Sequence, residues 1–165
     1  GEASFRPRLI SEEDMVKQAS EFAGTVPVRH LLPYWKTSNR YLFSGGSVNM
    51  RDAAVYAKEE NWSKAVELWK QTYETKKGKQ KMYAAYNTAL GYEMQDSIDT
   101  ALEWALKAQT LAREKSKTDK KETGEIHDGT ISYYIFISMY VDELEKRKEG
   151  MARLNMQMNR FDDDF

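Results

Sequence analysis

Histidine and cysteine, two residue types that often bind metals or carry out catalysis, are rare or absent in this chain. The only two histidines are His30 and His127, and neither has a second ligand at the spacing of a zinc site. Cysteine is absent, which excludes disulfides and thiolate chemistry. Glu59 and Glu60 are consecutive, so on a helix their side chains would diverge by roughly 100° and could not converge on one substrate. We therefore predict no catalytic residues, no metal site and no cofactor, and we expect the protein not to be an enzyme.

Three other short patterns imitate functional motifs but lack their defining residues. Gly45-Gly46 precedes a predicted helix, yet the rest of a nucleotide-binding fingerprint is missing. The acids that follow Ser11 fit the first turn of a helix, where the helix dipole favours them, and we predict this helix over 11–23. Residues 162–164 are consecutive aspartates without the loop glycine and closing glutamate of a calcium-binding EF-hand. We expect them to lie in a disordered acidic tail, residues 159–165.

The composition of the chain says more about its classes of binding partner than about its function. Lys and Arg number 25 against 26 Asp and Glu, so the net charge of -1 gives no global attraction to nucleic acid or an anionic membrane. No apolar run approaches the roughly 18–20 residues that a membrane-spanning helix needs. The chain begins with glycine, so we expect a native targeting segment or a preceding domain to be missing from it. We therefore predict no nucleic-acid partner and no transmembrane segment.

The elements that would position any binding residues come from an internal repeat. Ala53, Tyr56 and Ala65 recur as Ala89, Tyr92 and Ala101, each 36 positions later. Apolar residues in both segments follow helical spacing, with a short polar turn in the middle. We therefore predict two helix pairs, the first over 48–60 and 62–76 and the second over 81–94 and 98–115.

This repeat resembles the tetratricopeptide (TPR) family, in which small residues let paired helices approach closely and a large aromatic residue fills the turn. The predicted fold class is all-α, with TPR-like antiparallel helix pairs in two repeats, an irregular aromatic N-terminal segment and a long C-terminal capping helix. The resemblance assigns repeat packing to the following residues: Ala53, Tyr56, Trp62, Ala65, Trp69, Ala89, Tyr92, Ala101, Ala105 and Ala108.

The segments outside the repeat complete the predicted domain organisation. Residues 1–47 form an arm, a short helix and an aromatic cover, in which Tyr34-Trp35 and the segment 41–43 are candidates for short extended pieces. The helix pairs occupy 48–115, and the charged, polar residues 116–125 are predicted to be a loop. Apolar residues then follow helical spacing again, which predicts the capping helix over 126–158. Its charged second half is expected to face solvent, a second subunit or a missing domain.

The TPR resemblance also suggests where a ligand would bind, because TPR proteins hold extended peptides on the inner face of the first helix of each pair. On that face we identify Arg51, Tyr83, Tyr86 and Asn87 as candidate groove residues. Tyrosine offers contact area with a polar handle, and an asparagine amide can both donate to and accept from a peptide backbone. The alternative is that both tyrosines are core residues, covered by the segment 25–43 or by the final helix.

Charged residues divide between the two predicted edges of the helix stack. Lysines and arginines surround the links after each pair, whereas Glu59, Glu60, Glu93, Asp96 and Asp99 lie at the opposite edge. Cations suit the C-terminal ends of helices. The helix dipole does not explain Glu59, Glu60 and Glu93, because they sit at the C-terminal ends of their own helices.

Three functions follow from these patterns. The first is a non-catalytic TPR-like scaffold that binds a protein or peptide. The second is a structural or oligomerisation domain, with a possible homodimer through the C-terminal helix. The third is an accessory domain of a larger protein whose N-terminal part is missing from this chain.

Over residues 30 to 115, the order of aromatic lead-in, Gly-Ser break and tryptophans is similar to that in secreted or lipid-anchored proteins of Bacteroides-type bacteria. This resemblance implies an extracytoplasmic, periplasmic or lipid-anchored location and no particular activity.

Overall fold

The structure is a computed structural model that describes residues 31–34, 40–123 and 128–163. The elements run in the order β1 (Leu31–Tyr34), β2 (Arg40–Phe43), α2 (Val48–Lys58), α3 (Trp62–Thr75), α4 (Lys79–Met94), α5 (Ile98–Thr123) and α6 (Asp128–Asp163). The helix predicted over 11–23 lies outside these residues. The predicted all-α class is confirmed, since the described strands form only one small antiparallel pair.

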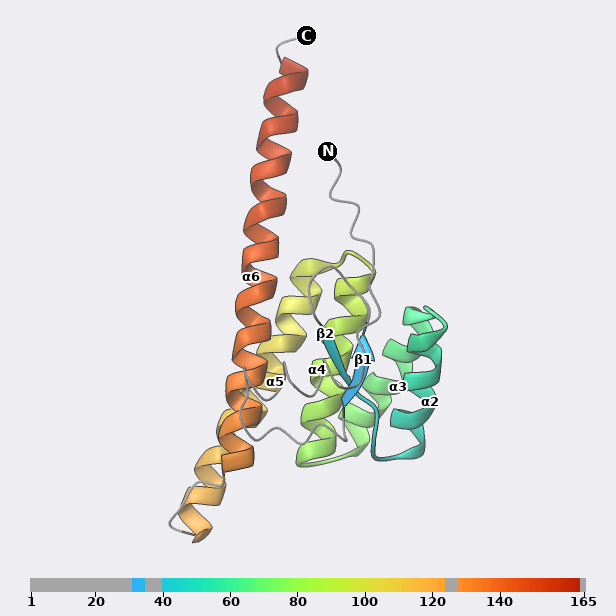
Figure 1. Ribbon diagram of the computed structural model, residues 1–165, viewed down its shortest axis with the longest axis vertical. Coiled ribbons are helices and arrows are strands. Elements are labelled where there is room, and N and C mark those ends of the chain that lie inside the picture. Colours follow the sequence, from blue (N-terminus) through green and yellow to red (C-terminus); the bar gives the residue numbers. More distant parts are fainter. Residues whose placement is uncertain (1–30, 35–39, 124–127, 164–165) are drawn as a thin grey trace.

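Helices that follow one another in the chain also pack against one another, from α2 through to α6 (Figure 1). Short polar links make these antiparallel turns possible. Ser47 caps α2 by accepting from the Met50 amide, and Asn61 caps α3 by accepting from the Lys64 amide. Glu60 and Asp96 take the left-handed conformation that ends the preceding helix. The result is an arc of helices with a concave inner side.

The residues assigned to repeat packing lie between the helices. Tyr56 and Tyr92 are half-buried, whereas the alanines and both tryptophans of the set are buried. Gly91 lies where α3 and α4 pack closely, because a Cβ at that position would collide with the Val66 side chain and lie 3.2 Å from the Trp69 ring. Small residues on α4 therefore let the two helices pack at short range.

The structure corrects two predicted segments. Residues 116–125 were predicted to be a loop, but α5 continues through Thr123. Lysine and glutamate propagate a helix well, and Thr118 and Lys117 each bond to Glu114 one turn earlier. The predicted disordered tail over 159–165 is also wrong for residues 159–163, which are the last residues of α6.

The long helix α6 belongs to the body at one end and projects from it at the other (Figure 1). Its first half packs on α5, with Tyr133, Ile137 and Leu144 buried. Every residue of 151–163 is exposed. None of the described helices is both long enough and apolar enough to span a membrane.

Candidate functional site

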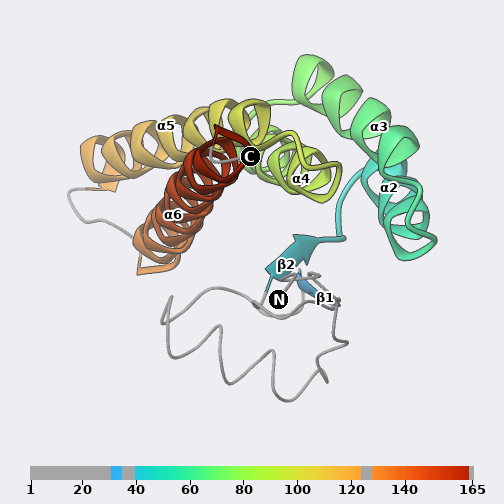
Figure 2. The same ribbon diagram turned by 90° about the horizontal axis from the view of Figure 1, so that it is seen from above.

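Strand β2 lies on the inner side of the helical arc, against α4 (Figure 2). This is the face on which the candidate groove was predicted. The strand β1 pairs with β2 in antiparallel register, with Leu32 opposite Leu42. Because alternate backbone groups of a strand point to opposite edges, β2 can pair with β1 along one edge and offer its other edge to the helices.

Two α4 side chains bind that free edge. The Asn87 amide oxygen accepts from the Phe43 N–H at 3.0 Å, and its amide nitrogen donates to the Phe43 carbonyl at 2.6 Å. Two residues earlier along β2, the Tyr86 hydroxyl donates to the Tyr41 carbonyl at 2.9 Å. These hydrogen bonds are made to the backbone of an extended segment, so they depend on the conformation of β2 more than on its side chains.

An aromatic cluster from α4 and α6 surrounds the end of the strand. The Phe43 ring is fully buried and stacks on Tyr83 with 4.2 Å between ring centroids, while Tyr86 meets its edge at 5.2 Å. From α6, Tyr133 and Phe136 complete the enclosure. The Tyr83 hydroxyl donates to that of Tyr133 at 2.8 Å. The end of β2 is therefore held between α4 and α6.

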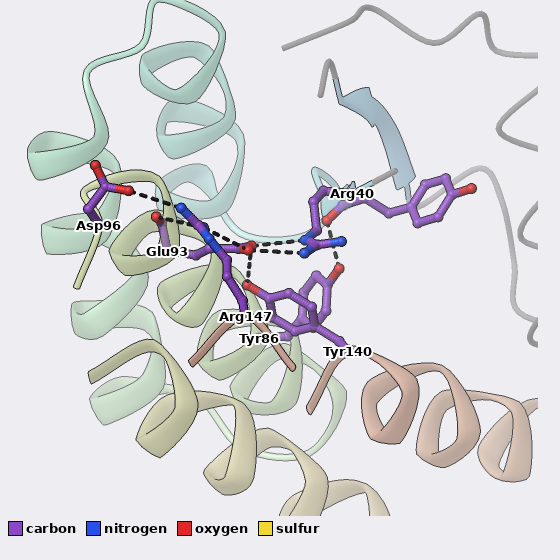
Figure 3. Close-up of polar contacts among 7 residues, drawn as sticks. Arg40, Tyr86, Glu93, Asp96, Tyr140 and Arg147 are labelled. Atoms are coloured by element: carbon purple, nitrogen blue, oxygen red, sulfur yellow. Dashed lines mark hydrogen bonds and ion pairs between the residues drawn. The ribbon is translucent and has the colours of Figure 1, made fainter. Parts of the chain in front are cut away.

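A buried carboxylate, Glu93, joins β2, α4 and α6 (Figure 3). Arg40 of β2 donates to both of its oxygens, from Nε at 2.9 Å and from Nη2 at 3.0 Å. From α6, the Tyr140 hydroxyl donates at 2.9 Å and Arg147 Nη1 at 3.0 Å. Arg147 also donates to the exposed Asp96 at 2.9 Å. We call the contacts of Asn87, Tyr86 and Glu93 with β2 the strand clasp.

Burial determines how strongly the charged groups of the clasp affect stability and protonation. Arg40 is 4% exposed and Glu93 is fully buried, so either charge alone would be costly in the core. Burial by itself lowers the pKa of Arg40, but the hydrogen bonds and negative charge of Glu93 outweigh it and raise that pKa above its ordinary value. Burial raises the pKa values of Tyr86 and Tyr140, and the charge of Glu93 adds to both effects. The site therefore holds its arginine charged and its phenols neutral.

The prediction of an open ligand groove is wrong for three of its four residues. Tyr83, Tyr86 and Asn87 are covered by β2 and α6, as the alternative interpretation required. The fourth, Arg51, is exposed on α2 and takes no part in the strand clasp. The residue types were suited to an extended backbone, but the backbone that they bind belongs to this chain.

Glu93 was predicted to lie at an acidic edge of the helix stack, but its side chain is buried. Its position at the end of α4 opposes the helix dipole, and the two arginines that bind it compensate for that conflict. Arg147 lies in the stretch of α6 that was expected to face solvent, a second subunit or a missing domain, but its side chain is 20% exposed and reaches Glu93. The conflict with the helix dipole was the sequence signal that marked Glu93; Arg40, Tyr140 and Arg147 had no comparable signal.

The chemistry of the clasp favours a structural role. Both oxygens of Glu93 are already occupied by donors, which leaves the carboxylate badly placed to exchange protons with a substrate. Among the residues that the structure describes, no group of three or more His, Asp or Glu side chains could hold a metal ion. His30 and His127 lie outside the described residues.

Comparison with known families divides the chain near the end of β2. A family model described as a domain of unknown function, DUF6340, matches residues 51–146, which is more than half of the chain. The chain belongs to the DUF6340 family. A second model, described as the domain of unknown function DUF8603, matches residues 2–43. The strand clasp thus joins the last residues of the DUF8603 match to Tyr86, Asn87 and Glu93 of the DUF6340 region. No curated protein and no solved structure matches the chain.

Proposed function

We propose that this DUF6340 chain is a non-catalytic scaffold for protein contacts. In it the packed helices form a TPR-like body, and the exposed end of α6, residues 151–163, projects from that body and is called the arm below. The observation that carries the proposal is the continuation along α6, beyond the body, of one stripe that is apolar except for Arg147. The side chains at alternating spacings of three and four residues are Ile137, Tyr140, Leu144, Arg147, Met151, Leu154, Met158 and Phe161. The first four contact the body, and the last four are exposed.

The inner face of the helices is already filled by β2, which favours protein binding through the arm rather than peptide binding in a groove on that face. Asn87, Tyr86 and Glu93 already bind β2, so a peptide from another protein would first have to displace a buried strand and the ion pair of Arg40. By contrast, Met151, Leu154 and Met158 are available at the surface, where an apolar stripe at this spacing suits a partner helix.

The TPR-like part of the proposal rests on the residue pattern and on the close approach of the helices. Ala53 and Ala65 are fully buried in the first pair, and Ala89 and Ala101 in the second. Small residues at matching positions in both pairs are what the repeat resemblance requires. An extracytoplasmic location, which the second resemblance implies, belongs to the same proposal and would be tested by cell fractionation.

Site-specific photo-cross-linking in the native host cell tests the arm as a contact surface. A photoreactive residue in place of Met158 should form a covalent adduct with a protein, because position 158 lies on the stripe. The matched control replaces Met156, which is equally exposed at 58% but lies off the stripe. No adduct at position 158, or equal yields at both positions, would remove the support for this function.

A further inference from the structure

We propose that the arm pairs with the arm of a second copy of this chain in antiparallel orientation, which gives a homodimer joined at the tips of α6. The inference rests on the proposed function and names the partner. Its starting point is the stripe over 151–161, which alternates spacings of three and four residues as the core of a two-helix coiled coil does.

An antiparallel copy matches this stripe to itself in one register. With Leu154 level with Met158 of the second copy, Met151 falls level with Phe161, and the two-fold axis repeats both pairs. Every large apolar side chain of the stripe then meets another apolar side chain, and four layers form. At about 1.5 Å of rise per residue, the layers span about 15 Å along the arm.

The charges beside the stripe favour the same register. Each heptad contributes two core positions, and Lys148 and Asp162 come directly after the second of them, at Arg147 and Phe161. Antiparallel pairing brings these flanking positions of the two copies together across the interface. Lys148 of each copy therefore faces Asp162 of the other. Lys148 lies at the base of the arm, where it also pairs with Asp99 of α5 at 2.9 Å. It is 55% exposed and retains room for a second carboxylate.

The position of the body selects the antiparallel orientation. The stripe faces the side of α6 on which the body packs, since Ile137, Tyr140 and Leu144 on the same stripe are buried there. A parallel partner would place its own body at the level of the first body, on the side that is already occupied. In the antiparallel register residue 163 of the second copy lies level with residue 149, just before the fully exposed part of α6 begins at residue 151. The two bodies would then lie at opposite ends of the paired arms.

The interface is small, so the dimer is expected to be weak and dependent on concentration. Four layers bury less than the roughly 1,200 Å² found in most stable complexes. Sedimentation of the full chain should show a monomer at low concentration and a dimer at high concentration. Met158→Glu should remove the dimer, because it places a charge in a core layer. Met156→Glu, the same change at an equally exposed position off the stripe, should leave it unchanged.

Cysteine cross-linking tests the register, because the chain contains no cysteine of its own. Leu154→Cys and Met158→Cys should form an intermolecular disulfide when the two variants are mixed and mildly oxidised, while each variant alone should form no disulfide. A parallel pair would instead cross-link each variant to itself. Charge reversal adds a second readout: Lys148→Glu and Asp162→Lys should each weaken the dimer, and the double variant should restore it.

The outcomes separate this inference from the proposed function. A chain that stays monomeric at every concentration, or that cross-links only with itself in each single variant, overturns the antiparallel dimer. If position 158 then still forms an adduct with a different protein in the cell, the arm remains a contact surface and only the identity of the partner is wrong. If position 158 forms no adduct at all, the proposed function fails as well.

Discussion

Asn87 binds both backbone groups of Phe43 along one edge of β2. Its amide oxygen accepts from the Phe43 N–H at 3.0 Å, and its amide nitrogen donates to the Phe43 carbonyl at 2.6 Å. Both residues are fully buried, so no water can replace either bond if the amide is removed. This pair of contacts is the most direct link between β2 and the helical body.

Asn87→Ala should lower the free energy of unfolding by about 1–3 kcal/mol for each backbone group of Phe43 that it leaves unsatisfied. Urea denaturation would measure the loss. Hydrogen exchange gives a local readout, since the Phe43 amide should exchange faster than in the parent. Asn49→Ala is a suitable control, because the bond from Asn49 to Gln71 is solvent-exposed and its loss should cost little. An unchanged Phe43 amide would show that the clasp does not depend on Asn87.

Glu93→Gln should destabilise the protein by about 3–5 kcal/mol, because it removes the countercharge of the buried Arg40 while preserving the size of the side chain. Asp96→Asn makes the same change in charge at a carboxylate that also binds Arg147 but is 80% exposed. We expect this control to cost less than about 1 kcal/mol. Similar losses in the two variants, measured by urea denaturation, would contradict a central role for Glu93.

The helices could be predicted because their signals are local. The repeat of Ala53 and Tyr56 at Ala89 and Tyr92 placed α2, α3 and α4 to within a few residues of their observed bounds, and it placed the start of α5 but not its end at Thr123. The predicted loop over 116–125 failed for a local reason too: charged residues and a nearby glycine resemble a loop, yet lysine and glutamate also extend an exposed helix.

The candidate site was predicted in its chemistry but not in its partner. The types of Tyr86 and Asn87 indicated a surface that binds an extended backbone. That backbone is Phe43 and its neighbours, 44 positions away in sequence from Asn87, and no periodic pattern connects the two. Glu93 was visible only as a conflict with the helix dipole. Arg147 was hidden among other charges on α6, and only packing against the body distinguishes it from them.

Gly91→Ala should destabilise the protein by about 1–3 kcal/mol, because the added methyl group overlaps the Val66 side chain and crowds Trp69 at the contact of α3 and α4. Gly150→Ala provides the opposite case. It lies within α6, and an added Cβ meets nothing within 4 Å. That change should raise helicity and stabilise α6 by about 0.5–1 kcal/mol. Circular-dichroism melts of both variants measure the difference, and equal shifts would rule out close packing at Gly91.

Alkaline pH should unfold the protein through its buried tyrosines. Burial raises the pKa values of Tyr86 and Tyr140 above that of a tyrosine in the unfolded chain, about 10, and it does the same for Tyr83 with help from the hydrogen bond to Tyr133. The folded state therefore keeps protons that the unfolded state releases. Their stabilisation is fully present below pH about 10 and is lost as the pH rises from there toward the raised folded values. Tyr86 and Tyr140 together should give a decline of up to about 2.7 kcal/mol per pH unit.

Tyr134 offers an internal reference for this titration. It is half-buried, and the hydrogen bond from Arg113 lowers its pKa. We expect Tyr134 to ionise first, with no loss of helical signal, and Tyr83, Tyr86 and Tyr140 to ionise together with unfolding. Phenolate absorbance and far-ultraviolet circular dichroism, recorded over the same alkaline series, separate the two steps. Tyr134→Phe should remove the earliest part of the phenolate signal and leave the unfolding step unmoved. If all phenols ionise while the helical signal stays constant, Tyr83, Tyr86 and Tyr140 are not enclosed by β2 and α6.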